Sequence, residues 1–150
     1  MASRRKEIVE FVVGQLKNIN GGTSTYDSVY GYNNNLFDNV FRKLKFLDEV
    51  NDFPAVYVSA GTEIRNFNSK DLTVAQLDVT IRAYVYGEDN SQSLADDLLE
   101  DIEHVIYSLE DSPTKGIQDI TIESITVDEG LVEPYGLAEV NLQITYRLEN

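Results

Sequence analysis

The sequence predicts an α+β fold: a mixed, mostly antiparallel sheet of four or five strands, with two long helices packed on one face. Three observations predict it. From Leu77 to Tyr86 apolar and polar residues alternate, which is typical of a strand buried on one side. Between Leu94 and Leu109 apolar residues recur at three- and four-residue steps, which place them on one side of a helix. Another strict alternation, from Val140 to Tyr146, predicts a closing strand.

Length and composition indicate one soluble domain over residues 1–150. The chain contains no cysteine, which excludes a disulfide framework and suits a reducing cytoplasm. The basic start is interrupted by Glu10, so an amphipathic helix explains it better than a signal peptide. No uninterrupted apolar run approaches the roughly 20 residues that a membrane span requires, so we expect no contact with a membrane.

The net charge of −14 is unevenly spread along the chain. Residues 1–87 carry ten basic and ten acidic side chains, whereas residues 88–150 carry sixteen acids against Lys115 and Arg147. This pattern argues against a protein that grips nucleic acid, because phosphate contacts need clustered Lys and Arg. An acidic surface that repels DNA is one interpretation, and composition alone favours plain solubility.

The first helix is predicted from Ser3 to Ile19, and Gly21 with Gly22 is expected to end it. A polar connection with several tyrosines follows over Thr23–Asn35. The tyrosines could anchor a partner, since Tyr supplies a large contact area at low entropic cost, or they could fold back on their own core. The sequence favours neither alternative.

Residues 36–50 fit both a helical stripe and an alternating strand. Phe53-Pro54 then opens a clear strand over Ala55–Ala60, since proline suits the first position of a strand. Gly61–Thr73 has no regular period, yet it joins two strands. We therefore expect a hairpin arm or a long loop that projects from the sheet.

A turn at residues 87–90 should lead into the second helix, and Ser93 followed by Asp96 resembles a capping-box start. Asp111-Ser112-Pro113 is expected to stop this helix. Ile117–Val127 is the next predicted strand, and a change in the parity of its apolar residues indicates a bulge near Ser124. Turn-forming residues fill the loop Asp128–Gly136.

Two helices can cover about one face of such a sheet. The other face should present side chains of the kinds enriched at interface centres: Thr80, Arg82, Tyr84, Tyr86, Thr145 and Arg147. The long strands also leave edges that natural proteins rarely leave bare. An oligomer that covers this face or extends the sheet would resolve both problems, and an ordinary solvated face is an equal alternative.

The sequence carries no recognisable catalytic, cofactor or metal site. His104 is predicted on an exposed helix flank, away from any cleft. A dense acidic face on the same helix lacks the loop carbonyls of a calcium cage, so we interpret it as solvated or DNA-repelling: Asp96, Asp97, Glu100, Asp101 and Glu103. Neither glycine-rich phosphate-binding motif is present. We therefore predict that the protein is not an enzyme and binds no cofactor.

Two stretches resemble a family of bacteriophage tail terminator, or tail completion, proteins. The first is residues 46–58, FLDEVNDFPAVYV, followed by a long arm and an alternating strand. The second comprises residues 126–130, TVDEG, residues 133–136, EPYG, and a closing strand that finishes ITYR. The resemblance in element order covers most of the chain, and it favours a strand over Val40–Leu47.

The resemblance implies a homohexameric ring in the virion, at the head-proximal end of the tail. The ring would cap the tail tube protein, end tube polymerisation and offer a joining surface to a head-side connector or neck protein, while DNA passes through its lumen without being specifically bound. Assembly would take place in the host cytoplasm. Related alternatives are a head–tail connector or neck ring protein, and a non-viral acidic adaptor domain.

Candidate residues follow from position in the predicted fold rather than from family motifs. For the subunit interface they are Arg82, Tyr84, Tyr86 and Arg147. The two arginines are expected to pair with acids of the next copy. For contact with the tube or neck they are Arg65, Phe67 and Lys70 on the arm, with Glu133 and Tyr135 on the last loop. For the lumen they are Asp96, Asp97, Glu100 and Asp101.

Overall fold

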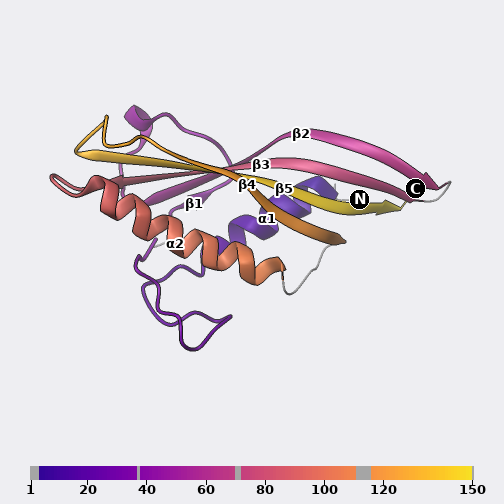
Figure 1. Ribbon diagram of the computed structural model, residues 1–150, viewed down its shortest axis with the longest axis horizontal. Helices are drawn as coiled ribbons and strands as arrows, with labels where there is room; N and C mark the ends of the chain where they lie inside the picture. The colour runs from indigo at the N-terminus through magenta and orange to yellow at the C-terminus, as the bar shows by residue number, and fades with distance from the viewer. Residues whose placement is uncertain (1–3, 37, 70–71, 111–115, 150) are drawn as a thin grey trace.

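The protein forms a five-stranded mixed sheet in the order β1-β2-β3-β5-β4, with two helices on one face (Figure 1). The computed structural model describes residues 4–36, 38–69, 72–110 and 116–149. This architecture confirms the predicted fold class. The elements are α1 Arg4–Leu16, β1 Val40–Phe41, the 3-10 turn η1 Leu47–Glu49, β2 Ala55–Ser69, β3 Leu72–Tyr86, α2 Ser91–Glu110, β4 Ile117–Val127 and β5 Tyr135–Glu149.

The long hairpin β2–β3 and the strand β5 form the centre of the sheet. β2 and β3 each contain 15 residues and pair antiparallel, and β5 pairs antiparallel with the whole length of β3. The hairpin alternative for residues 61–73 is therefore correct, and a register shift between Ala60 and Glu63 accounts for the missing period. The paired strands extend beyond the helices at one end of the molecule (Figure 1).

The core lies between the helices and the inner face of the sheet. The alternating apolar residues of β3 and β5 are buried together with the stripe of α2: Leu77, Val79, Ile81, Ala83, Val85, Val140, Leu142, Ile144, Tyr146, Leu98, Ile102, Val105, Ile106 and Leu109. From α1 the buried residues are Ile8, Val9, Val12 and Leu16. Both strong periodicities in the sequence are thus explained by burial against each other.

β4 coincides with its predicted bounds and its predicted bulge. The strand pairs antiparallel with β5, and its register shifts between Ile122 and Ser124. The extra residue explains why the apolar side chains change parity along the strand. β5 begins at Tyr135, so the loop before it ends earlier than predicted.

The predicted strand over Val40–Leu47 is wrong beyond its first two residues. β1 pairs parallel with β2 through Val40 and Phe41, and η1 begins at Leu47. The chain then crosses to the outer face of the sheet, where Val50 forms a second small cluster with Ala55, Tyr57 and Tyr84. Leu44 and Phe46 are exposed, so the alternation of apolar residues in this segment does not mark a buried strand.

Both helices differ from their predicted ends. The amide of Leu94 donates to the carbonyl of Asn90 at 3.0 Å, so α2 begins at Ser91, two residues before the predicted cap. A Cβ at Gly136 would lie 2.8 Å from the Ser91 carbonyl oxygen, so glycine is what lets this helix start pack against β5. α1 ends at Leu16 rather than Ile19. The predicted stop at 111–113 lies outside the described residues.

Substitution of Ile102 by Ala should destabilise the fold by about 2–5 kcal/mol, because this side chain is fully buried in the core and its loss leaves a cavity. Ile64→Ala is the matched control, since the Ile64 side chain is 55% exposed and should change the free energy of unfolding by no more than about 0.5 kcal/mol. Urea unfolding followed by circular dichroism measures both. Equal losses would contradict the assignment of the core face.

Candidate functional site

The tube or neck candidates lie at opposite ends of the long strands. Arg65 stands near the tip of the β2–β3 hairpin, where its exposed guanidinium contacts the Glu63 carboxylate at 2.7 Å. That carboxylate also accepts from the Tyr146 hydroxyl, and burial together with this contact raises the pKa of Tyr146 to about 12. Phe67 is part of strand β2, and Lys70 lies outside the described residues.

The other end of the sheet carries an aromatic cluster formed by Phe53, Tyr86 and Tyr135. The ring centroid of Tyr135 lies 5.6 Å from that of Phe53 and 5.2 Å from that of Tyr86. Glu133 is exposed next to this cluster and accepts a hydrogen bond from the Ser91 hydroxyl at 3.3 Å. The last loop thus presents an aromatic ring and a carboxylate beside the start of α2.

The Asp128 carboxylate shapes the last loop. It accepts from the amide of Leu137 at 3.1 Å and from the amide of Val132 at 3.4 Å. Glu129 and Gly130 adopt positive φ angles of 59° and 83°, which turn the chain back toward β5. Because Asp128 holds both ends of the loop, Glu133 and Tyr135 occupy defined positions.

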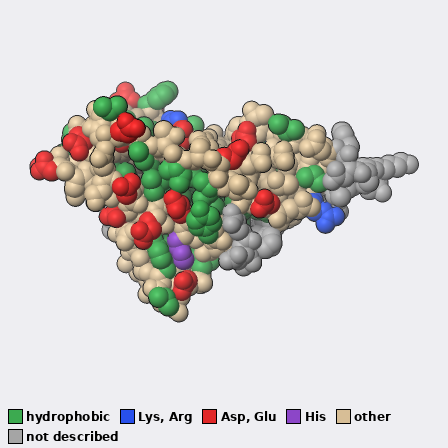
Figure 2. Space-filling view, in the orientation of Figure 1, with side chains coloured by type: hydrophobic (Ala, Val, Ile, Leu, Met, Phe, Trp, Pro, Cys, Tyr) green, Lys and Arg blue, Asp and Glu red, His purple; other side chains and the backbone are tan. Residues whose placement is uncertain are grey.

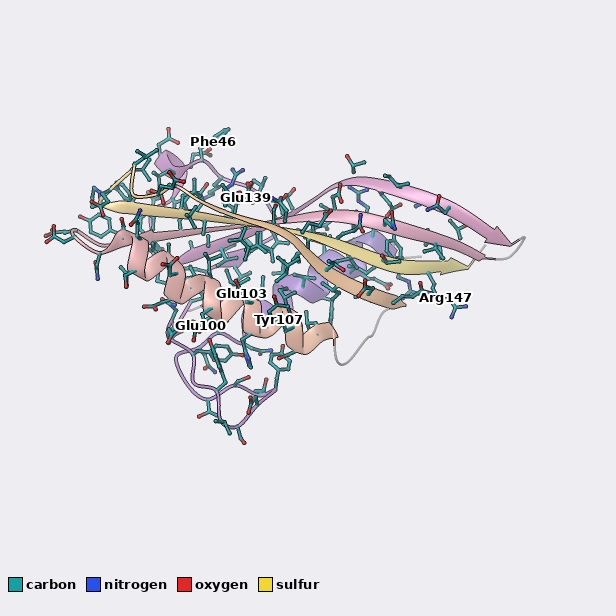
Figure 3. The ribbon with its side chains drawn as sticks, viewed as in Figure 1. Phe46, Glu100, Glu103, Tyr107, Glu139 and Arg147 are labelled. Atoms are coloured by element: carbon teal, nitrogen blue, oxygen red, sulfur yellow. The ribbon has the colours of Figure 1, made fainter. Side chains whose placement is uncertain are left out.

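The outer face of the sheet corrects part of the predicted subunit interface. Tyr84 is only 1% exposed, because the chain segment before β2 covers it and the carbonyl of Lys45 accepts from its hydroxyl. Its burial raises the pKa of Tyr84. Tyr84 therefore has no surface to offer a neighbouring copy. Tyr86 is 46% exposed, and Arg147 is exposed near the far end of β5 (Figure 3).

Arg82 has a partner within its own chain. Its Nη2 lies 2.8 Å from Glu139 Oε1, across the β3–β5 pair, and this contact raises the pKa of Arg82. Beside this pair, the hydroxyl of Thr80 donates to Asn141 at 3.2 Å. The expected pairing of Arg82 with an acid of another copy is therefore replaced by a cross-strand ion pair on a face that remains part-exposed.

The acidic face of α2 contains one carboxylate that is not on the surface. Asp96, Asp97 and Glu100 are exposed, as predicted. Asp101 is fully buried and is excluded from the predicted lumen-facing set. Its carboxylate accepts from the Tyr30 hydroxyl at 2.8 Å, from the amides of Asn33 and Asn34 at 3.0 and 2.9 Å, and from the Asn34 side chain at 3.1 Å.

The tyrosines of the connection between α1 and β1 fold back on the core. The ring of Tyr30 stacks on His104 at a centroid distance of 3.9 Å, and Tyr26 and Tyr32 contact His104 edge-on. Burial and the Asp101 carboxylate raise the pKa of Tyr30. The prediction of an exposed His104 is wrong, because this connection covers it. Of the two alternatives for the tyrosines, the structure supports packing against the chain itself.

The spacing of Asp101 in the sequence indicates a buried position, whereas the acidic residues around it indicate an exposed one. Asp101 lies three residues after Leu98 and four before Val105, so it stands on the buried stripe of α2. A carboxylate on an apolar stripe needs donors, and the run of asparagines at residues 33–35 supplies them. Neither feature alone identifies the contact.

The geometry around His104 is structural rather than catalytic. Ser24 Oγ lies 2.7 Å from His104 Nε2, but Ser24 is 5% exposed and its oxygen also accepts from the amide of Tyr26 at 3.1 Å. Asp101 binds the loop and is not seen bonded to the imidazole. The described part of the chain contains no group of three or more His, Cys, Asp or Glu side chains that could hold a metal ion, and no helix there is long and apolar enough to cross a membrane.

Comparison with known proteins gives matches over most of the chain. A family model described as Bacteriophage Tail Tube Terminator Protein matches residues 2–150. The chain is 33% identical over 127 residues to "Tail tube terminator protein p142" of Escherichia phage T5, a match that covers 77% of this chain and 79% of that protein. A chain of the solved structure "Virion of native gene transfer agent (GTA) particle" aligns with a TM-score of 0.49 and 11% identity, covering 75% of this chain and 79% of that chain.

Asp101→Asn should lower the free energy of unfolding by about 2–3 kcal/mol, because the buried site contains N–H and O–H donors suited to a charged acceptor. Asp97→Asn on the exposed side of α2 makes the same chemical change. It should leave the free energy of unfolding within about 0.5 kcal/mol of the parent value. Urea unfolding measures both. Similar values for the two variants would show that Asp101 does not hold the connection in place.

Proposed function

The chain belongs to the bacteriophage tail tube terminator family, and from that membership we propose that six copies form a ring that caps the tail tube. The chain is thus a structural component of the phage tail. In the proposed role, the ring ends the polymerisation of the tube protein and provides the surface on which the head-side connector docks. Assembly in the host cytoplasm and a head-proximal position belong to the same proposal. The main observation that supports this proposal is the family match over residues 2–150.

An incompletely covered sheet supports self-association. The two helices and the connection between α1 and β1 cover the inner face, while residues 46–53 cover only one end of the outer face. The remainder is only part-buried around Thr80, Arg82 and Asn141. A neighbouring copy would shelter this area, with Tyr86 and Arg147 as the exposed candidates for contact.

The length of the strands supports contacts in two directions. A ring between tube and head has two faces that meet different partners. Arg65 and Phe67 lie toward the hairpin tip, while Glu133 and Tyr135 lie at the opposite end of the sheet (Figure 1). We assign one set to each face of the ring, without choosing which set meets the tube.

The exposed acids of α2 suit the lining of a channel for DNA. Asp96, Asp97 and Glu100 are exposed, and α2 contains no Lys or Arg. Carboxylates along a channel repel phosphates, so that DNA can slide without forming ion pairs. This role uses electrostatic repulsion and needs no catalytic group.

Addition of the protein to polymerising tail tube protein should halt growth and leave tubes with a six-fold ring at one end. Negative-stain microscopy measures tube length and end structure, and mass photometry tests for a species at six times 16.9 kDa. Tubes that continue to grow at saturating protein would contradict the terminator role. Rings of another order would contradict only the hexamer.

Charge reversal of the lumen candidates should make the ring retain DNA. The double variant Asp96→Lys and Asp97→Lys should bind duplex DNA at least about tenfold more tightly at low salt and slow genome ejection from assembled particles, because lysines pair with passing phosphates. Asp48→Lys with Glu88→Lys makes the same change in net charge on exposed residues elsewhere. Fluorescence anisotropy and ejection kinetics measure the effects, and equal behaviour of both variants would place α2 outside the lumen.

A further inference from the structure

We infer that neighbouring copies join by pairing the open edge of β4 with the open edge of β2, so that one sheet continues from copy to copy. This inference rests on the proposed ring and names the contact that closes it. "The β4 edge" denotes the free side of residues 117–127, and "the β2 edge" the free side of residues 62–69.

Both edges expose backbone groups that pair with no other strand of the described chain. β4 pairs with β5 on one side, and its other side is the border of the sheet. β2 has β1 beside it through the pairs at Val56 and Tyr57, which leaves its distal part bare. Where the bare part begins, the Arg5 side chain donates to the Gly61 carbonyl at 2.5 Å. Unpaired edges of this length are templates for another strand.

The directions of the two edge strands fit a continuous sheet. β2, β3, β5 and β4 follow one another through three antiparallel pairings, so β2 and β4 run in opposite directions. A neighbour in the same orientation therefore brings its β4 antiparallel to β2. The contact uses different surfaces on the two copies, and such head-to-tail contacts generate rings when the rotation closes.

The side chains at the β4 edge are apolar and acidic. Ile125 and Val127 are 39% and 37% exposed, and Tyr107 on α2 is 51% exposed. Figure 2 shows hydrophobic side chains gathered between this edge of the sheet and α2, with acidic side chains around them. α2 and β4 contain no Lys or Arg, whereas Asp119 and Glu123 belong to β4.

The side chains at the β2 edge differ from those at the β4 edge, because they include arginines. Ile64 is 55% exposed, and Arg65 is exposed beside it. Arg5 reaches the same edge from α1. The acid of this stretch, Glu63, has a side chain only 8% exposed and is already bound by Arg65. Arg5 therefore adds a cation to an edge at which Glu63 and Arg65 neutralise each other, and Ile64 adds an exposed apolar side chain.

Disulfide trapping tests the pairing directly, because the chain contains no cysteine. Asn66 on β2 and Thr121, Ser124 and Thr126 on β4 are exposed and share the outer face of the sheet. Asn66→Cys is combined in turn with each of the three β4 positions and oxidised. We expect one combination to give a ladder of linked chains that ends at six, since a disulfide requires Cα atoms about 4.4–6.8 Å apart.

The single-cysteine variants serve as controls. Mixing the Asn66→Cys chain with the matching β4 variant should give linked dimers and nothing larger, and neither variant alone should link. Preferential linking of Asn66→Cys to itself would overturn the inference, because it would indicate a symmetric contact. Six-fold rings that link in none of the three combinations would overturn the edge pairing and leave the ring intact. A parent protein that stays monomeric alone and on tubes would overturn both.

A second pair of variants weakens the edge without a cross-link. Ile125→Lys with Val127→Lys should raise the concentration needed for half-assembly at least about tenfold, because lysines on an edge strand oppose pairing. Val29→Lys with Thr25→Lys is the control with the same gain of two lysines, since both residues are exposed and belong to the connection between α1 and β1. Mass photometry measures assembly, and thermal unfolding checks that both variants fold. Unchanged assembly of the edge variant would overturn the inference.

Discussion

The fold depends on one constraint: two helices must bury the inner face of a sheet that is longer than they are. Ile81 and Val140 face each other across β3 and β5 and are fully buried against this layer. Burial of large aliphatic side chains is the dominant favourable term in folding, so this face fixes the register of both strands. The outer face receives only a short covering segment, and the distal half of the hairpin extends past α1 and α2 (Figure 1).

Elements that bury one face against a single neighbouring layer could be predicted from the sequence. The strands β3 and β5 and the helix α2 each have a single buried face, so their periods are clean. The bulge in β4 was predictable for the same reason, because Ile120 and Ile125 both face inward although they are five positions apart, an offset that places residues of a regular strand on opposite faces. Local pattern and tertiary environment agree in these elements.

Residues with partners far along the chain could not be predicted in this way. Charge alone assigns Asp101 to a solvated face, yet its hydrogen-bond donors come from residues about 70 positions earlier. The alternation along β3 places Tyr84 on the outer face of the sheet. Tyr84 is nevertheless covered, because the chain before β2 crosses that face. Val40 packs in the main core and Val50 packs on the outer face, so neither a helical nor a strand period describes the segment between them. In each case the outcome depends on where a connection runs.

The acidic character that makes Asp101 resemble a surface residue also constrains how copies of the chain can associate. A symmetric contact of two β4 edges would bring Asp119 and Glu123 of one copy close to the same acids of the other, and β4 contains no Lys or Arg to offset them. Like charges directly opposite in a sheet are destabilising, whereas unlike edges attract. Charge therefore disfavours a two-fold contact between β4 edges, whereas a head-to-tail contact must either close or grow without limit. The proposed role as a tube cap requires the closed form, and the acids of β4 oppose the two-fold contact that would compete with it.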